Sequence, residues 1–353
     1  MNGDPHDISG RRISAPVLPE AFSWLFDRIS EPLALVERAL KEQIISDVEL
    51  VPILGEHVLS AGGKRLRPAL LLLAAELCGY TGPRRIGIAA AIELLHTATL
   101  IHDDVVDMSS LRRGEPSANA VWGNRRAVLA GDFLYARASC MVLEDGNAEI
   151  LEMFALSIQR MAEGELLQLQ RSFEIDMTEA EYFDIIERKS AVLLAGTCEA
   201  GAILGGVTRA ESRRLAAYGR YLGLAFQLKD DALDYDSVSG VLGKRRYADL
   251  QEGKVTLPLL LSLKRCSTAE RELVAGVLKR AASLEGMSSQ GDDGPLGSQA
   301  VAEIVSRYRG VEDTLRRADE HVSRASEAIA AFPDSPAKQA LVAAAAFAVG
   351  RDR

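Results

Sequence analysis

The stretch that organises this chain is His96-Thr-Ala-Thr-Leu-Ile-His-Asp-Asp-Val-Val-Asp-Met-Ser-Ser-Leu-Arg-Arg113, which follows a run of apolar helix formers. We expect one helix from about Arg85 to Met108, because the run contains no proline. At about 100° per residue, His96, Asp103 and Asp107 fall within roughly 40° of one another on this helix. The two carboxylates repel each other near the negative C-terminal end of the helix dipole. Hard oxygen ligands of this kind suit Mg²⁺. For an isolated motif, the alternative to a metal site is an acidic helix end exposed to solvent.

Length and composition limit the possible classes of protein. With 353 residues, of which 48% are hydrophobic, and a net charge of −9, the chain can form a large core. The acidic balance argues against nucleic acid as a partner. No apolar run reaches the roughly 18 residues of a membrane span, and the N-terminus lacks a basic-then-apolar signal. The four cysteines are widely spaced, so we expect a soluble cytoplasmic protein with reduced thiols.

Helical periodicity extends along most of the chain and predicts an all-α fold. We expect a flexible leader at 1–18, one helical domain at 19–353 and a surface insertion at 287–298 within it. A capping box at Thr178 and Glu181 predicts a helix over Tyr182–Leu194. No stretch alternates apolar and polar residues long enough to make a convincing strand. Further helices are expected at about 69–77, 124–144, 148–171, 212–236, 258–266, 300–309, 311–331 and 336–349.

A second acidic cluster occurs in Gln227-Leu-Lys-Asp-Asp-Ala-Leu-Asp-Tyr235. Gln227, Asp230 and Asp234 follow one another at three- and four-residue steps, so they form a stripe like the first one. Each cluster ends a long apolar helix and has a hydrogen-bonding side chain on its stripe, Gln227 here and His96 in the first. Two such clusters facing each other would make a site for several divalent cations.

Basic residues are concentrated near the acidic clusters. Lys64, Arg65 and Arg67 surround the start of the helix that Pro68 begins, where the dipole disfavours positive charge. Cations and free backbone N–H groups at a helix start favour a phosphate-type anion, with a solvated basic turn as the alternative. Further cations flank the clusters at Arg112, Arg113, Lys189, Lys244 and Lys254.

Together these clusters favour chemistry on two diphosphates, one chelated through Mg²⁺ and one held directly. The sequence has no P-loop, no GxGxxG motif and no spacing typical of Ser/His/Asp or Cys/His catalysis. Apolar helices beside the phosphate sites suit an allylic diphosphate that ionises. Mg²⁺ would stabilise the leaving diphosphate, and a deep apolar cavity inside the helical bundle would guide the carbocation.

In its motifs the chain resembles the trans-isoprenyl diphosphate synthases, most closely the bacterial long-chain, octaprenyl-type enzymes. The resemblance covers about Leu35 to Arg351. It is carried, in this order, by Gly62-Gly-Lys-Arg-Leu-Arg-Pro68, Glu93 to Asp107, Leu111-Arg-Arg-Gly114, Gly131-Asp-Phe133, Gly164-Glu-Leu166, Arg188-Lys-Ser190, Phe226 to Asp234 and Gly253-Lys-Val-Thr-Leu-Pro258.

The resemblance implies a helical isoprenoid synthase fold and a Mg²⁺-dependent, sequential 1'-4 condensation of isopentenyl diphosphate onto an allylic diphosphate. The steps are ionisation, condensation and proton loss, with the departing diphosphate as the base; the product would serve quinone side chains. The resemblance also implies a homodimer and about three Mg²⁺ ions in each site. It assigns metal binding to Asp103, Asp107, Asp230 and Asp234, with Asp104 and Asp231 in support. It assigns the allylic side of the site to Arg112, Lys189, Ser190, Gln227 and Lys244, and isopentenyl diphosphate to Lys64, Arg67, His96 and Arg113. Lys254 is a further candidate for substrate binding.

Three positions depart from the family pattern. Ser190 replaces the usual Thr, Lys229 replaces a usual apolar residue, and Tyr247 stands where Gly is common. The small side chains of Ala98 and Thr99 occupy positions where short-chain enzymes place aromatic rings, which predicts an open tunnel and a long product.

Other functions are weighed against the long-chain synthase. The alternatives are a short-chain geranylgeranyl or farnesyl diphosphate synthase and a non-catalytic regulatory subunit. A terpene cyclase would not need the basic site for a second diphosphate. A purely structural helical protein would leave the acidic stripes and the basic patches unexplained together.

Overall fold

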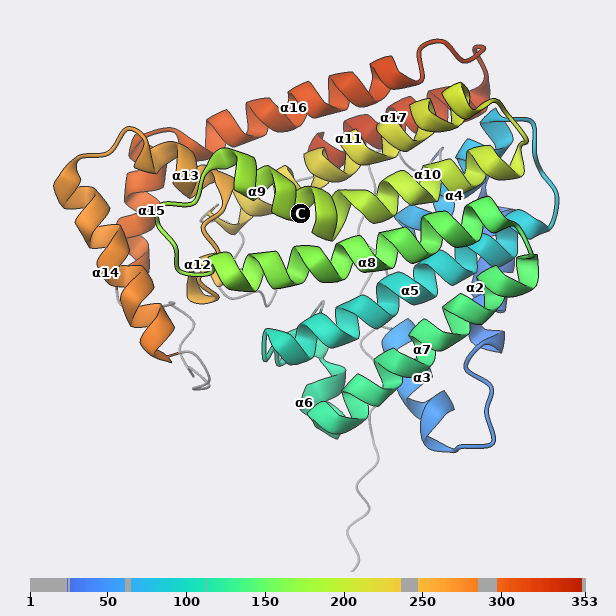
Figure 1. Cartoon of the computed structure of the whole chain (residues 1–353), viewed down its shortest axis with the longest axis horizontal. Coiled ribbons are helices and arrows are strands. Elements are labelled where there is room, and N and C mark those ends of the chain that lie inside the picture. Colours follow the sequence, from blue (N-terminus) through green and yellow to red (C-terminus); the bar gives the residue numbers. More distant parts are fainter. Residues whose placement is uncertain are drawn as a thin grey trace, which may run out of the picture.

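The computed structural model describes residues 24, 26–60, 65–112, 114–235, 247–284 and 297–350. Nearly all of this part of the chain is helical, so the all-α prediction is confirmed (Figure 1). The predicted leader at 1–18 lies outside the described residues, as do Lys64, Arg113, Lys244 and all but the last two residues of the predicted insertion. No helix in the described ranges is long and apolar enough to span a membrane.

The N-terminal part forms α2 (Ser30–Glu42), α3 (Leu50–Ser60), α4 (Leu66–Leu77) and α5 (Arg84–Val106). The last of these is the predicted central helix, one residue earlier at its start and two shorter at its end. Its residues 88–95 are all buried, because α5 packs against α2, α4, α7 and α10. A helix that is apolar on every side is stable only in such an interior position.

The connection after α5 contains two short strands and a short helix. Strands β1 (Leu111–Arg112) and β2 (Glu115–Pro116) pair antiparallel, and α6 (Ala118–Trp122) follows them. Strands of two residues are too short to leave an alternating pattern in the sequence. Helices α7 (Asn124–Asp145) and α8 (Ala148–Arg171) then lie close to their predicted bounds.

The helix predicted over Tyr182–Leu194 is present, but it begins at Glu179 and contains a π-helical turn. The predicted capping box at Thr178 and Glu181 is present and begins α9 (Glu179–Ile186). A π-helical turn, labelled η1 (Glu187–Ala191), separates α9 from α10 (Val192–Leu204). Such a turn inserts one extra residue and is often found at functional sites. Here it contains Lys189 and Ser190.

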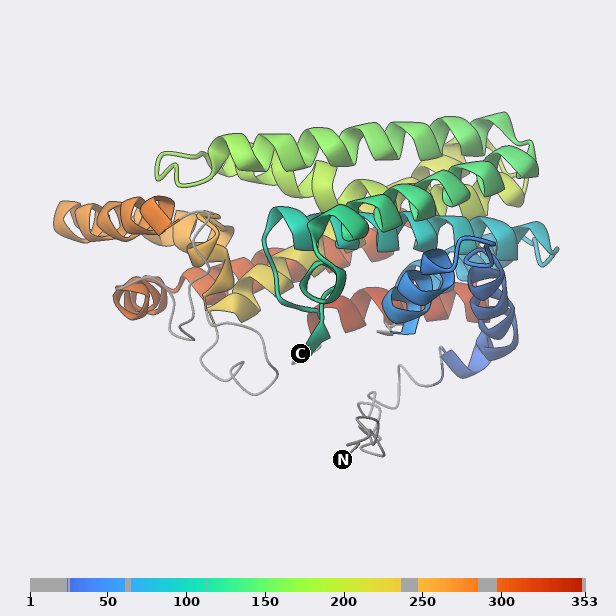
Figure 2. The ribbon, with the colours of Figure 1, turned by 90° about the horizontal axis from the view of Figure 1, so that it is seen from below.

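A second capping box, Thr208 with Glu211, begins α11 (Arg209–Asp234) three residues before the predicted start. The remaining helices are α12 (Ala248–Gln251), α13 (Leu257–Leu263), α14 (Thr268–Leu284), α15 (Ser298–Arg307), α16 (Gly310–Ala328) and α17 (Pro336–Gly350). The sequence analysis expected neither α12 nor α14. Figures 1 and 2 both show α14 and α15 extending beyond one end of the main bundle.

Close helix packing places the end of α11 beside η1. A Cβ added to Gly219 would lie 2.2 Å from the carbonyl oxygen of Leu194, and one added to Gly223 would lie 2.6 Å from Cα of Ala191. Only glycine permits so short a distance between the two backbones. The glycines of α11 therefore bring its C-terminal carboxylates towards the π-helical turn.

Candidate active site

The two aspartate clusters end α5 and α11, as predicted, and a lysine pairs with the first of them. Lys254 lies between α12 and α13, and its Nζ is 3.4 Å from Oδ2 of Asp107. The same ammonium group pairs with Glu252. Burial alone would lower the pKa of Lys254, but the charges of Glu252, Asp107 and Asp249 raise it, so the side chain stays protonated. One half-buried cation thus compensates Asp107, Glu252 and Asp249.

The surroundings of Asp103 disfavour the charged form of its carboxylate. Burial, together with the charges of Glu165 and Asp107, raises the pKa of Asp103 to about 6, although Lys189 opposes the shift. Nζ of Lys189 is 2.8 Å from the carboxylate of Glu165 on α8. A buried carboxylate with so little compensation binds a cation favourably.

Asp104 has a different role from its neighbour. It is 4% exposed, and its Oδ1 accepts hydrogen bonds from Arg112 at 2.9 Å from Nε and 2.5 Å from Nη2. The ion pair joins the end of α5 to β1. Asp104 therefore positions Arg112, and its supporting role in metal binding stays a prediction.

Asp234 holds the backbone of the next helix. Its Oδ1 accepts from the N–H of Ala248 at 3.0 Å, and its Oδ2 accepts from the N–H of Asp249 at 3.3 Å. These are the first two residues of α12, whose N–H groups have no partner within the helix. Burial and the charge of Asp249 raise the pKa of Asp234. A metal-binding role for Asp234 stays a prediction, and the observed role is an anchor for α12.

The π-helical turn and α11 contribute a hydrogen-bonded group to the site. Oγ of Ser190 donates to Oε1 of Gln227 at 2.7 Å, and Nε2 of Gln227 donates to Oδ1 of Asp231 at 2.8 Å. Oδ2 of Asp231 accepts from the hydroxyl of Tyr182 at 2.5 Å. The side chains of Lys189, Ser190, Gln227 and Lys254 line one cavity of about 120 Å³.

The π-helical turn depends on a glycine of α8. A Cβ added to Gly164 would lie 2.8 Å from the backbone nitrogen of Lys189 and 2.9 Å from Cβ of Arg188. Gly164 therefore permits η1 to lie directly against α8, next to Glu165.

The basic turn before α4 is described from Arg65 onwards. Arg65 is left-handed, at φ 45°, and donates to Glu93 at 3.0 Å, to Glu37 at 3.2 Å and to the carbonyl of Leu59 at 3.2 Å. Arg65 was expected among the phosphate-binding cations, whereas its ion pairs join α4 to α2 and α5 and its hydrogen bond to Leu59 reaches α3. His96, Arg65 and Arg112 line a second cavity of about 40 Å³.

Tyr247 and Lys229 are two of the positions that depart from the family pattern. Tyr247 has φ 55°, a left-handed conformation that glycine adopts without strain. Its side chain is 6% exposed, and its hydroxyl is 3.2 Å from Oε1 of Gln299 on α15. Lys229 is half-buried and shares no ion pair with the described residues.

Ala98 and Thr99 remain predictions as determinants of product length. Ala98 is 1% exposed within a core cluster that includes α7 residues, and Oγ1 of Thr99 donates to the carbonyl of His96 at 2.8 Å.

Three functional-site residues had no role in the sequence analysis: Glu165, Tyr182 and Asp249. Glu165 stood within a quoted motif, but its partner Lys189 is 24 residues away in the sequence. Tyr182 and Asp231 are 49 residues apart. No local spacing could have paired them.

Comparison with known proteins identifies the family. A model of the family described as Polyprenyl synthetase matches residues 49–289. The octaprenyl diphosphate synthase of Escherichia coli (strain K12) is 41% identical over 324 residues, which are 92% of this chain and 97% of that protein. A short chain isoprenyl diphosphate synthase of Methanothermobacter thermautotrophicus is 38% identical over 324 residues, covering 90% of this chain and 96% of that protein.

A crystal structure gives the same result for the fold. The polyprenyl synthase of Caulobacter crescentus CB15, complexed with calcium and isoprenyl diphosphate, is 40% identical and superimposes with a TM-score of 0.87. The match covers 94% of this chain and 98% of that one. The chain therefore belongs to the polyprenyl synthetase family and is a prenyltransferase.

The close contact at Gly164 yields a prediction. Gly164→Ala should displace Lys189 and lower kcat/KM for prenyl transfer at least about tenfold, since misplacement of a positioning group by ~1 Å can cost more than that. Gly87→Ala on α5 is the matched control, because a Cβ there would meet no atom within 4 Å. Equal kcat/KM values for the two variants would show that the close approach of η1 to α8 is not required.

Proposed function

We propose that this protein is a long-chain all-trans polyprenyl diphosphate synthase that supplies quinone side chains. It would condense isopentenyl diphosphate repeatedly with a growing allylic diphosphate. The observation that carries the proposal is the arrangement of cations around the aspartate clusters: Lys254 pairs with Asp107, Arg112 with Asp104, and Lys189 with Glu165 close to Asp103. A diphosphate with bound Mg²⁺ would fit between these carboxylates and basic side chains.

The donor set fits Mg²⁺, with Asp103, Asp107 and Asp230 as its ligands and Asp234 contributing through its remaining lone pairs. All are hard oxygen donors, and the raised pKa of Asp103 reflects a buried carboxylate that lacks a full counter-charge. Among the described residues no three acidic, His or Cys side chains converge on one point. This suits a metal that is held by one or two carboxylates and by substrate phosphate oxygens. About three bound ions would neutralise the departing diphosphate.

The chain's own side chains would orient the substrates. Lys189, Lys254 and Arg112 already pair with carboxylates, so they can turn towards diphosphate oxygens without being moved into the site. Lys244 is proposed for the same substrate from its motif. Ser190 and Gln227 line the cavity where the allylic carbon would ionise.

The second diphosphate belongs to the basic turn before α4. Arg67 and His96 would bind isopentenyl diphosphate, together with Lys64 and Arg113, which are assigned by motif alone. The ion pairs of Arg65 with Glu37 and Glu93 hold this turn in place. The proton lost after condensation would go to the departing diphosphate, so no side-chain base is required.

The product length decides between the long-chain proposal and its alternative. Relatives of similar identity include both an octaprenyl and a short chain synthase, so overall similarity does not discriminate. The small side chains of Ala98 and Thr99 favour the long product, because they leave space at positions where short-chain enzymes place aromatic rings.

One assay tests the proposed activity. The purified chain, incubated with isopentenyl diphosphate, Mg²⁺ and geranyl, farnesyl or geranylgeranyl diphosphate in turn, should form allylic products well beyond twenty carbons on thin-layer chromatography. Removal of Mg²⁺ with EDTA should abolish turnover, and added Mg²⁺ should restore it. A lack of product with every primer would support the regulatory-subunit alternative, and products of at most twenty carbons would support the short-chain one.

A substitution tests how product length is set. Thr99→Phe should shorten the product, because the ring would block the interior beside Asp103. Ala98→Phe should also shorten the product. Because Ala98 is buried, the added ring would also overpack the core, which destabilises the fold by about 1–3 kcal/mol. Val342→Phe, at a 39% exposed site on α17, is a control for added bulk. An unchanged product length in Thr99→Phe would exclude this role.

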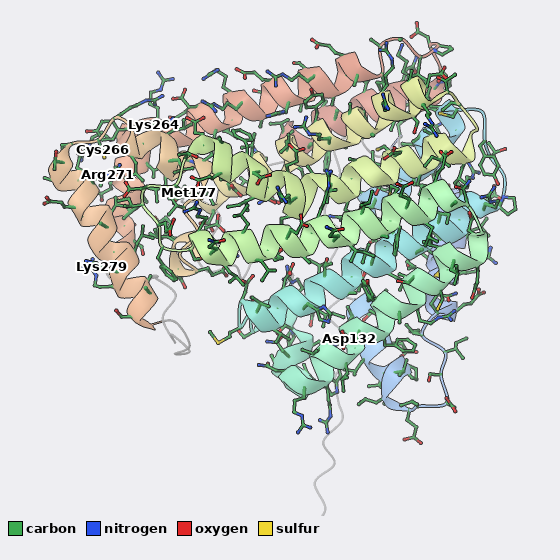
Figure 3. All side chains as sticks on the ribbon, viewed as in Figure 1. Asp132, Met177, Lys264, Cys266, Arg271 and Lys279 are labelled. Carbon is green, nitrogen blue, oxygen red and sulfur yellow. The ribbon has the colours of Figure 1, made fainter. Side chains whose placement is uncertain are left out.

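We also propose a cytoplasmic homodimer that forms through α7. Four large apolar side chains on this helix are at least 38% exposed: Val128, Leu129, Tyr135 and Leu143. Asp132, on the same helix, is also exposed (Figure 3). A row of exposed apolar side chains of this kind is typical of an interface between subunits.

The dimer can be tested by sedimentation. The wild-type chain of 38.1 kDa should sediment at twice that mass, and Leu129→Glu with Leu143→Glu should dissociate it. Leu273→Glu, at a 40% exposed site on α14, should leave the dimer intact. A monomeric wild type, or dissociation by the α14 variant as well, would contradict the assignment to α7.

A further inference from the structure

Four polar side chains from three elements form one connected hydrogen-bonded row. It runs from Tyr182 of α9 to Asp231 of α11, then to Gln227 one turn earlier and to Ser190 of η1. The three distances are 2.5, 2.8 and 2.7 Å. Tyr182 and Asp231 are each 3% exposed, so water has little access to this end of the row.

The row determines which way the amide of Gln227 faces. Both partners of Asp231 donate to it, the Tyr182 hydroxyl to Oδ2 and the Gln227 amide nitrogen to Oδ1. The amide nitrogen of Gln227 therefore faces Asp231, and its carbonyl oxygen faces Ser190. The hydroxyl hydrogen of Ser190 is committed to that carbonyl, so the serine oxygen can present only lone pairs to other groups.

The far end of the row depends on the phenol. Without the Tyr182 hydroxyl, Oδ2 of Asp231 would be a buried acceptor with no donor, a costly state. Rotation of the carboxylate could then satisfy Oδ2 with the amide of Gln227 and weaken the bond now made by Oδ1. The orientation of Gln227, and with it that of Ser190, would no longer be unique.

We propose that Tyr182 is a positioning residue for prenyl transfer, acting through Asp231 to orient the Gln227 amide and the Ser190 hydroxyl at the allylic carbon. The inference rests on the proposed function of this site. It gives Asp231 the role of joining Tyr182 to Gln227, since its two oxygens accept from these two side chains. It also explains why a buried tyrosine outside the two aspartate motifs belongs to the site.

A purely structural role for Tyr182 makes a different prediction. Its ring packs in an apolar cluster with Ile185, Leu224 and Leu228, and it contacts the ring of Phe183 edge-on at 5.4 Å between centroids. Tyr182→Phe keeps this packing and removes only the hydroxyl. The packing of η1 on α11 at Gly219 and Gly223 is untouched, so the fold should persist.

The first experiment compares two tyrosines that each donate to a carboxylate. Tyr308 donates to Oε2 of Glu270 at 2.8 Å, on the α14–α15 side of the molecule. Tyr182→Phe should lower kcat about tenfold or more, with KM for isopentenyl diphosphate within about twofold of wild type. Tyr308→Phe should leave both constants unchanged, and the two variants should unfold within a few degrees of each other.

The second experiment is a double-mutant cycle with Ser190→Ala. If Tyr182 acts through the row, adding Tyr182→Phe to Ser190→Ala should lower kcat less than about twofold further. Multiplication of the two single effects would overturn the inference, as would a normal kcat for Tyr182→Phe in an active enzyme. An inactive wild type in the same assay would instead refute the proposed function.

Discussion

The arrangement of the site depends on compensation of crowded carboxylates by a small number of buried cations. Two helices end with aspartates at the negative poles of their dipoles, where further negative charge is unfavourable. Lys254 offsets this at Asp107, Glu252 and Asp249, while Lys189 pairs with Glu165 close to Asp103. The same cations that would meet substrate therefore also stabilise the site without substrate.

Because these cations pair with protein carboxylates and would also contact substrate, substrate binding would replace one set of ion pairs with another. A diphosphate with its metal ions would take over the lysine and arginine partners, while the metal ions would take over the aspartates. Charge would then be exchanged between pairs and not newly buried, so little of the binding energy would be lost to desolvation. The pairs of Lys254 with Asp107 and of Arg112 with Asp104 are the contacts in which this exchange would begin.

The sequence alone predicted the features that arise from spacing along one helix. The stripes of α5 and α11, the capping box at Thr178 and the order of the motifs needed no tertiary information. The π-helical turn was not predictable, because it depends on the absence of a side chain at Gly164 on another helix. The same holds for Arg65, whose partners Glu37 and Glu93 lie 28 residues away on either side. Helix α14 was predictable from the capping box at Ser267 and Glu270, which was overlooked.

The contacts of Asp234 determine what a substitution in the second aspartate motif would affect. Its carboxylate holds the first N–H groups of α12, and the backbone N–H of Lys254 donates to the carbonyl of Asp249 within that helix at 2.7 Å. Loss of the Asp234 carboxylate would therefore loosen the segment that carries Lys254, the cation opposite Asp107. An inactive Asp234 variant would report on the first aspartate cluster as much as on the second, so equal severity at both motifs would not imply equal metal ligation.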